Sequence, residues 1–347
     1  MISPEDYVVI QVEGQGLDAG QRVLELTRPL AMAGISIFFK TTYFSDYILV
    51  PLKARSSVVT ALEQRGFTFS VDVSAFMHQS QLSPPPSSHR NHRHSPSSSQ
   101  SSGTLGECSF HQHSSHRTPP STPPAANVHE LQTRTFTRLR KNNITPEADR
   151  SIQLISCAGR KEETPDNLSK LKDDLLQCLI STCTCPSSKN AEVENIPENC
   201  TRFLSLTLTD VDPISLFIES RFVNPPSDAA CSASPSTFHT LKSLPNLVLG
   251  SRDQPDDTLI PIILDLRELP LEATGIVCGV AATLSRDTAI NTSEGQPDAV
   301  EISFLSTAKA GTVLVKENDL SKALGAMETG FSMAVKEMEQ KDGGPTT

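Results

Sequence analysis

The chain has 347 residues, of which 37% are hydrophobic, and its formal net charge at pH 7 is -10. That length allows two or three domains, and the acidic balance argues against nucleic-acid binding, which needs a basic face. No apolar run approaches the roughly 18 to 20 residues that span a bilayer, and the N-terminus lacks the features of a secretory signal. We therefore expect no nucleic-acid partner, no membrane association and free cysteines.

Residues 1–78 predict a compact unit with the order β-α-β-β-α-β. Val23, Leu26 and Leu30 recur at three- and four-residue spacing, which is typical of one face of a helix, and Gly34 is a natural stop. The expected elements are a strand at 7–12, a helix at 17–33, strands at 35–39 and 47–52, a helix at 56–65 and a strand at 67–73. This order is that of the ferredoxin-like class.

The next 52 residues, 79–130, are rich in Ser, Pro and His. Such a segment buries too little apolar surface to offset its ordering entropy, so we predict a disordered linker. Its scattered histidines could bind metal, but they are more typical of a solvated linker. Cys183 and Cys185 are a weak metal signal without a second ligand pair. We expect no metal and no cofactor.

Two middle regions are less regular. Residues 131–200 form a variable connecting region with a possible strand at 151–157 and helix at 168–180. The basic stretch at 133–143 predicts either an amphipathic helix for a partner or membrane surface, or a plain basic edge. Residues 201–250 predict a partial unit of the same kind as residues 1–78, with a strand at 202–208 and a helix at 213–223.

Residues 257–336 repeat the N-terminal order, before a disordered tail at 337–347. The expected elements are a strand at 259–266, a helix at 272–284, strands at 300–306 and 312–316, a helix at 319–327 capped by Asn318, and a strand at 331–335. The stretch "EISFLSTAKAGTVLVKENDLSKAL" parallels "ISIFFKTTYFSDYILVPLKARSSVVTAL". We therefore predict an α+β protein with tandem ferredoxin-like βαββαβ domains separated by the linker.

The stretch "PLAMAGISIFFKTTYFSDYILVPLKARSSVVTALEQRGF" resembles an ACT domain of the CASTOR family, the cytosolic arginine sensors upstream of TOR complex 1. "TGIVCGVAATL" and "ISFLSTAKAGTVLVKENDLSKAL" are similar to the C-terminal ACT unit of that family. The resemblance covers residues 5–75 and 257–336. It implies a cytoplasmic, non-catalytic amino-acid sensor, here apparently truncated at its N-terminus because the family's first ACT half has no counterpart.

The resemblance also implies a ligand site between the two ACT units. A helix N-terminus in such a cleft attracts a carboxylate. By motif position, the ligand-binding residues are Ser36, Ile37, Glu272, Ala273, Gly275, Ile276, Thr307, Ala308, Ala310 and Gly311. The family's arginine sensor carries Phe-x-Phe-Asp after the turn threonine, whereas this chain has Ala-Lys-Ala-Gly. The acid that pairs with a guanidinium is lost, so we expect a neutral or acidic amino acid, or no ligand, in place of arginine.

The turn Tyr43-Phe44-Ser45-Asp46 is unusually aromatic for a hairpin. In the family this turn meets the GATOR complex, so Tyr43, Phe44 and Asp46 are the implied partner-binding residues. An exposed aromatic pair is typical of protein contacts. In the alternative interpretation, the two rings cap the end of the sheet and Asp46 bonds the backbone of its own turn.

No catalytic motif is present, and Gly14, Gly16 and Gly20 do not fit a dinucleotide or phosphate loop. We expect a non-enzymatic protein. Three functions remain open: an amino-acid sensor that signals to a partner, a detached allosteric ACT subunit of an amino-acid biosynthetic enzyme, and a ligand-free ACT scaffold. ACT units often pair across chains, so a homodimer is also expected.

Overall fold

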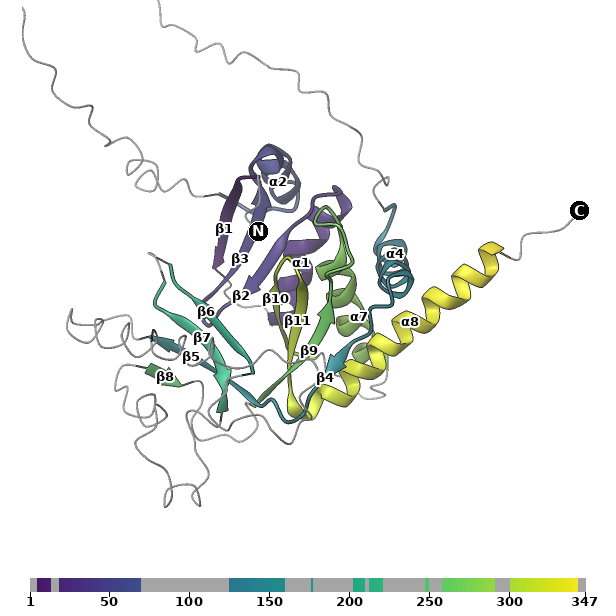
Figure 1. Ribbon diagram of the computed structural model, residues 1–347. Coiled ribbons are helices and arrows are strands. Elements are labelled where there is room, and N and C mark those ends of the chain that lie inside the picture. Colours follow the sequence, from purple (N-terminus) through teal and green to yellow (C-terminus); the bar gives the residue numbers. More distant parts are fainter. Residues whose placement is uncertain are drawn as a thin grey trace, which may run out of the picture. The chain divides into compact units, whose positions relative to one another are not determined.

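The computed structural model describes residues 5–13, 19–69, 125–159, 176, 202–209, 212–220, 247–249, 258–290 and 300–342 (Figure 1). The chain divides into two units, Met1–Gly66 with Pro124–Thr347, and Phe67–Pro123. All the helices and strands named below belong to the first unit. Most of the predicted linker, the Cys183–Cys185 pair and all but Leu176 of the helix predicted at 168–180 lie outside the described residues.

The N-terminal half has the predicted order over its first five elements. These are β1 (Tyr7–Glu13), α1 (Ala19–Met32), β2 (Phe38–Thr41), β3 (Ser45–Pro51) and α2 (Arg55–Glu63). The strands pair antiparallel in the order β1-β3-β2. Helix α1 buries the predicted face, and Gly34 follows it with a φ of 68°, a conformation that glycine adopts without strain. Residues 67–69 are not in a strand, and the rest of the strand predicted at 67–73 is not described.

The C-terminal half repeats this arrangement. It comprises β9 (Leu259–Asp265), α7 (Ile276–Ile290), β10 (Ile302–Ser306), β11 (Ala310–Lys316) and α8 (Leu320–Asp342). Its strands lie in the order β9-β11-β10, which matches β1-β3-β2. The protein is therefore an α+β protein with two ferredoxin-like units.

Three predictions for this half were wrong. Residues 337–342, which were predicted to belong to a disordered tail, are the last residues of α8. The strand predicted at 331–335 is part of α8, because Phe331 and Ala334, three residues apart, share a helical face. The Phe331 ring meets the Phe136 ring edge to face at a centroid distance of 5.0 Å, and Ala334 is buried. Apolar residues alternate along part of this segment, and that pattern had predicted a strand. Asn318 was expected to cap the last helix, but it lies within a 3₁₀ turn, Glu317–Asp319, that precedes α8.

The two halves meet at β2 and β10. These strands share one backbone pair, Lys40 with Leu305. Lys40 lies opposite Tyr47 in its own half, and Leu305 lies opposite Thr312, which occupies the same position in the repeat. The pair therefore lies on a pseudo-two-fold axis that relates the halves. On either side of it, a hydroxyl supplies the cross-strand bond: Thr41 Oγ1 accepts from Phe304 N at 3.0 Å, and Ser306 Oγ accepts from Phe39 N at 2.5 Å.

The middle of the chain completes the sheet beyond β9. The strands are β4 (Glu147–Ala148), β5 (Leu154–Gly159), β6 (Leu204–Thr207), β7 (Ser215–Glu219) and β8 (Leu247–Leu249). β4 and β5 pair with β9, and β7 lies between β5 and β6. The strands predicted at 151–157 and 202–208 are confirmed. The helix predicted at 213–223 is instead β7, which pairs with β5 and β6 on its two sides and whose five side chains are all buried.

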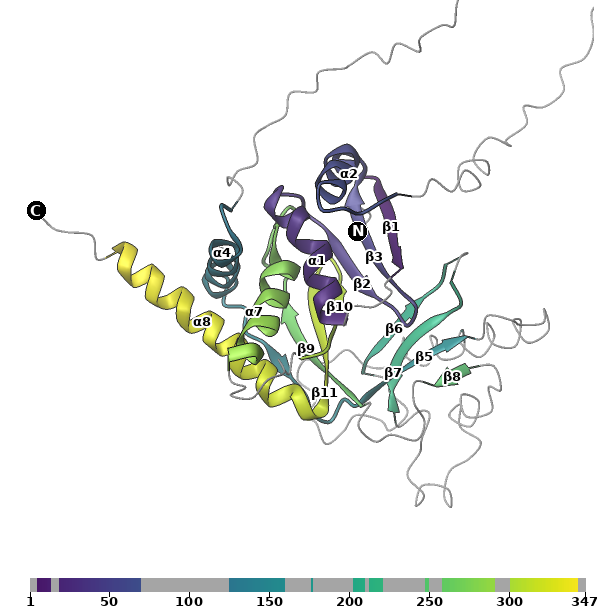
Figure 2. The same ribbon diagram turned by 180° about the vertical axis from the view of Figure 1, so that it is seen from behind.

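One further helix, α4 (Val128–Lys141), packs against α7 and α8 (Figure 2). The Asn127 side chain caps it by accepting from Glu130 N at 2.8 Å, and Glu130 accepts in turn from Ala126 N. The predicted linker thus ends several residues before 130. The basic stretch at 133–143 is helical to Lys141, and its apolar residues Phe136 and Leu139 are buried. Among the described residues, no helix has the length and apolarity needed to cross a membrane.

Candidate functional site

The structure brings the residues just before β2 close to the loop before α7. The Ser36 hydroxyl donates to the Leu271 carbonyl at 3.1 Å. Beside this bond lies a small cavity, which we call the α7 cavity. It is lined by Thr27, Ala31, Ile35, Ile37, Ala273, Gly275, Ile276, Val277 and Cys278. Four of the implied ligand residues, Ile37, Ala273, Gly275 and Ile276, therefore line one cavity, while Glu272 is exposed outside it.

The N-terminus of α7 forms one wall of this cavity. Gly279 N donates to Gly275 O at 2.8 Å, so the backbone N–H groups of Ile276, Val277 and Cys278 precede the first bonds of the helical ladder. The partial positive charge at such an end favours a carboxylate. The remaining walls are largely aliphatic, and burial raises the pKa of the Cys278 thiol to about 11. The cavity can therefore present amide donors and apolar contacts, but the thiol is neutral near pH 7.

The α7 cavity is too small for an amino acid as it stands. Its volume is about 20 Å³, roughly the space one water needs and far below the 300 Å³ or more of typical ligand pockets. Helix α4 and a residue shortly before its cap pack against two of the residues that line it. Leu131 and Ala125 form one buried cluster with Ala31 and Cys278, two of the lining residues.

Two glycines, Gly275 just before α7 and Gly279 within it, allow α4 to approach this closely. Gly275 has a φ of 82°, and a Cβ built on it would lie 2.6 Å from Leu131 Cδ1. A Cβ on Gly279 would overlap Thr135, whose hydroxyl donates to the Gly275 carbonyl at 3.2 Å. Sequence reasoning missed this contact because α4 and α7 are far apart in the chain and the glycine spacing alone has many interpretations. The fit of α4 onto α7 depends on both glycines.

The second group of implied ligand residues lies elsewhere. Thr307 and Ala308 lie in the β10–β11 hairpin turn, and Ala310 and Gly311 begin β11. Thr307 N donates to Ala310 O at 2.8 Å, as Thr42 N does to Ser45 O at 2.9 Å in the other half. None of the four lines the α7 cavity. The structure therefore does not bring these four residues into the α7 cavity with the first group of implied ligand residues. The β10–β11 turn is instead the structural counterpart, in the C-terminal half, of the aromatic turn.

The aromatic turn differs from expectation at one residue. Tyr43 and Phe44 are 41% and 40% exposed, and their rings meet edge to face at 5.0 Å. Asp46 is only 1% exposed and pairs with Arg22 at 3.0 Å. Burial raises the pKa of Asp46, and the bond from Arg22 opposes that shift. Asp46 thus links α1 to β3 in the interior of the protein. The hydrogen bonds within the turn are made by the Thr42 hydroxyl to the backbone of Ser45.

Asp212 links β7 to the N-terminal half, which no motif had signalled. Its Oδ2 accepts from Gln11 Nε2 at 3.0 Å, from the Ser45 hydroxyl at 2.7 Å and from the Tyr47 hydroxyl at 2.7 Å. Tyr43 N also donates to the Ser215 hydroxyl at 2.9 Å. The residues after β6 therefore fix the position of the aromatic turn. The partners are more than 150 positions apart in the chain, so only the folded structure reveals them.

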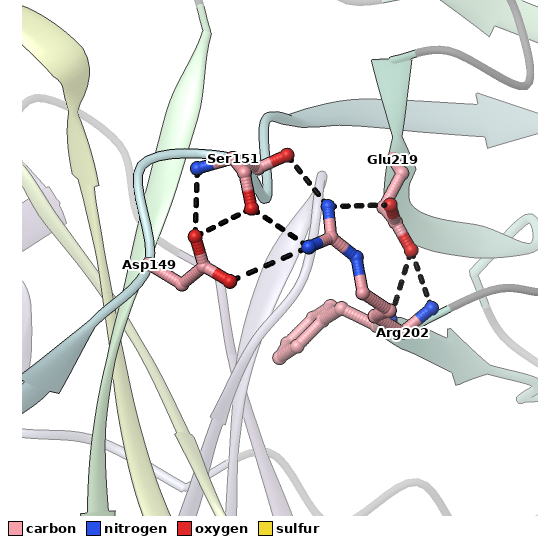
Figure 3. A network of polar contacts seen from close by, with 5 residues as sticks. Asp149, Ser151, Arg202 and Glu219 are labelled. Atoms are coloured by element: carbon pink, nitrogen blue, oxygen red, sulfur yellow. Dashed lines mark hydrogen bonds and ion pairs between the residues drawn. The ribbon is translucent and has the colours of Figure 1, made fainter. Parts of the chain in front are cut away.

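A second polar network joins charged groups from separate segments of the chain (Figure 3). Arg202 donates to the Ser151 hydroxyl and carbonyl, both at 2.7 Å, and lies 3.5 Å from Glu219. Glu219 is 1% exposed and also accepts from the backbone N–H groups of Arg202 and Phe203. The Ser151 hydroxyl donates to Asp149 Oδ1 at 2.5 Å and accepts from Arg202. The network fastens the loop before β5 to β7. Among the described residues, no cluster of three or more His, Cys, Asp or Glu side chains could hold a metal ion.

Comparison with known proteins finds a family match within the N-terminal half. A family model described as the ACT domain matches residues 2–64. A search of curated proteins found no match.

Solved structures with a similar arrangement include aspartate kinases. That of Synechocystis is 12% identical, with a TM-score of 0.32, over 94% of this chain and 40% of that one. That of Clostridium acetobutylicum is 14% identical, with a TM-score of 0.31, over 54% of this chain and 34% of that one. The ligand-free regulatory subunit of aspartate kinase from Thermus thermophilus is 10% identical, with a TM-score of 0.30, over 54% and 98%. This chain thus spans well under half of either whole kinase. The protein contains an ACT domain at residues 2–64.

Proposed function

We propose that this protein is a non-catalytic regulatory protein that binds a small amino acid in the α7 cavity. The observation that carries the proposal is the meeting of Ile37 with Gly275 and Ile276, from opposite halves of the repeat, at a helix N-terminus. An amide-rich helix end binds a carboxylate, and the aliphatic walls accept a small side chain. Binding requires the cavity to widen, and in this proposal α4 moves to allow it, because Leu131 packs in one buried cluster with Ala31 and Cys278, which line the cavity. Ligand binding would then be coupled to the position of α4.

The test is a thermal-shift screen against the twenty amino acids, run on the wild type and on Leu131→Ala. A ligand that binds only the folded state raises the free energy of unfolding by about 2.7 kcal/mol at a hundredfold excess over Kd. We expect one small amino acid to raise the melting temperature, and to do so at lower concentration in Leu131→Ala, whose cavity is larger. The matched control is Leu139→Ala on the same helix, because Leu139 is fully buried but does not belong to the cluster that Leu131 forms with Ala31 and Cys278.

The resemblance to the CASTOR family supplies the finer version of this proposal. In that version the protein is cytoplasmic, and the exposed Tyr43–Phe44 pair contacts a GATOR-like complex in signalling to TOR complex 1. The alternative partner is an amino-acid biosynthetic enzyme for which this chain serves as an allosteric subunit. Capture of the full chain from its own cells, with Tyr43→Ala as control, separates the two, because the co-purifying protein is either a regulatory complex or a kinase or dehydrogenase.

A second candidate function is a ligand-free ACT scaffold. The volume of about 20 Å³ favours it, since no amino acid fits while α4 is docked. In that case Leu131→Ala loses stability, as a cavity mutation should, and no amino acid restores it. A melting temperature that is indifferent to all twenty amino acids in both proteins would favour the scaffold over the sensor.

A further inference from the structure

Strand β1 pairs with a described strand on one of its two sides. It pairs with β3 along its whole length and is the first strand in the order of the sheet (Figure 1). In the C-terminal half its counterpart, β9, pairs with β11 on one side and with β4 and β5 on the other. Among the described residues, no strand pairs with the outer side of β1. The N-terminal half therefore leaves open a sheet edge that the C-terminal half covers.

One hydrogen bond shows which backbone groups of β1 face outward. Leu52 N donates to Asp6 O at 2.8 Å, so these two residues form a hydrogen-bonded pair at the end of the β1–β3 ladder. Such pairs alternate with non-bonded pairs along an antiparallel ladder. The even-numbered residues of β1 therefore bond to β3, whereas Tyr7, Val9 and Gln11 direct their N–H and C=O groups away from it. These outward groups are a template for one more strand.

The sequence of β1 does not protect this edge. Natural edge strands avoid pairing with other chains through proline, lysine, bulges or a very short length. β1 reads YVVIQVE, runs for seven residues and pairs with β3 without a bulge, so it has none of these features. Val9 is 58% exposed, whereas Pro261, which occupies the same place in β9, is buried. The strand therefore has the length and composition that favour addition of a strand.

The side chains beside the edge favour an apolar neighbour. Val9, Leu49 and Phe38 form one cross-strand row over β1, β3 and β2. Leu49 and Phe38 are half-buried, and the Phe38 ring meets the Tyr7 ring at 5.7 Å. A strand added to β1 places one side chain directly beside Val9 and extends this row. An apolar side chain at that position removes the exposed surface of Val9 from water.

The charges at the start of β1 indicate the kind of partner. Glu5 and Asp6 are both exposed just before the strand, and Lys53 donates to Glu5. A basic residue at the end of an added strand is therefore attracted to Asp6. The whole chain has a formal net charge of -10, which opposes a second copy at this edge and favours a basic partner.

We propose that β1 binds an extended segment of a partner protein as an added antiparallel strand, and that this segment has alternating apolar residues followed by a basic end. The N–H and C=O groups of Tyr7, Val9 and Gln11 make the backbone hydrogen bonds, and Asp6 pairs with the basic end. No residue of β1 lines the α7 cavity, so this inference does not depend on the proposed function. It also assigns a partner surface other than the exposed Tyr43 ring.

The test is fluorescence anisotropy of a labelled peptide, in which Thr and Val alternate before a C-terminal Lys-Lys, titrated with the full chain. One control peptide ends in Glu-Glu, and another is N-methylated at two successive central residues, which blocks both of its edges. We expect both controls to bind at least tenfold more weakly.

Variants of the protein test the same edge. Val9→Pro removes one outward N–H while leaving the bonds to β3, and Val9→Lys adds a charge to the edge. We expect each variant to weaken binding of the Lys-Lys peptide at least tenfold. Met333→Lys, the same change at an exposed position on α8, should leave affinity unchanged. Melting curves show whether Val9→Pro is folded, and Val9→Lys keeps the test valid if it is not.

Amide hydrogen exchange, resolved by residue, shows whether the edge is open. In the free chain the N–H groups of Val9 and Gln11 should exchange at least tenfold faster than those of Val8 and Ile10, and the Lys-Lys peptide should slow them. Slow exchange at Val9 in the free chain would show that a second copy or another part of the chain already covers the edge, and the proposal would fall. Equal binding of the Lys-Lys and Glu-Glu peptides, or unchanged affinity in both Val9 variants, would also overturn it.

Discussion

The hydroxyl of Thr41 accepts a hydrogen bond from the backbone N–H of Phe304 at 3.0 Å, where the two halves of the repeat meet. Thr41 is 4% exposed, so Phe304 N has no water to replace that partner. We expect Thr41→Val to lower the free energy of unfolding by about 1–3 kcal/mol, the typical cost of a buried unsatisfied donor. Thr41→Ser keeps the acceptor and should lose less. Urea denaturation measures both, and equal losses would show that the hydroxyl contributes nothing.

We expect a methyl group added to α7 at Gly279 to weaken the packing of α4 on α7. Gly279→Ala places a Cβ on Thr135, so we expect it to loosen α4 and to lower the free energy of unfolding by about 1–3 kcal/mol, as overpacking does. Gly325→Ala on α8 is the matched control, because a Cβ there meets nothing within 4 Å. Alanine in an exposed helix should stabilise the protein by about 0.4–1 kcal/mol. A destabilising Gly325→Ala, or a neutral Gly279→Ala, would contradict the fit.

The Cys278 thiol reports on the closure of the α7 cavity. Burial raises its pKa to about 11, so at pH 8 it is almost entirely protonated and a poor nucleophile. We expect alkylation of Cys278 at pH 8 to be slow in the wild type and faster in Leu131→Ala, which uncovers the cavity. Mass spectrometry of tryptic peptides measures the rate at this residue. Cys157, whose pKa burial raises to about 12, is the internal control and should stay slow in both proteins.

The burial of Asp46 predicts that the free energy of unfolding depends on pH. Burial raises its pKa above that of the unfolded chain, so the folded state holds the proton more tightly. Its contribution is therefore fully present below the unfolded pKa of about 3.9 and is lost as the pH rises through the folded pKa. Asp46→Asn does not titrate and keeps an acceptor for Arg22.

Urea denaturation of the wild type and Asp46→Asn across about pH 4–7 measures this effect. The stability of the wild type relative to the variant should fall as the pH rises. A constant difference between the two proteins would show that the Arg22 ion pair fully offsets the cost of burying Asp46.

The bond from Tyr47 to Asp212 links the aromatic turn's half of the protein to β7. Hydrogen bonds to a charged group contribute about 1.5–3 kcal/mol, so Tyr47→Phe should destabilise the wild type by an amount in that range. In an Asp212→Ala background the same change should have almost no effect. The double-mutant cycle therefore yields a coupling energy near the single-mutant loss, and a coupling near zero would exclude an energetic link.

The sequence by itself determined the elements whose hydrophobic period is unambiguous. The stripe of Val23, Leu26 and Leu30 defined α1, the flanking glycine ended it, and the parallel stretches around Thr42 and Thr307 predicted two related units. The ACT match over residues 2–64 and the shared hairpin bonds agree with that prediction. Local spacing sufficed because each of these elements buries one face regardless of which partner covers it.

Only the tertiary structure decided which distant segments complete the sheet and the site. The segment from Phe331 to Val335 alternates as a strand would, yet it continues α8 because Phe136 of α4 is available to cover Phe331. Asp46 lies in a turn that looks exposed, yet Arg22 and the packing of α1 bury it. Burial, ion pairing and cavity closure depend on contacts between residues far apart in the chain, and local sequence spacing does not encode those contacts.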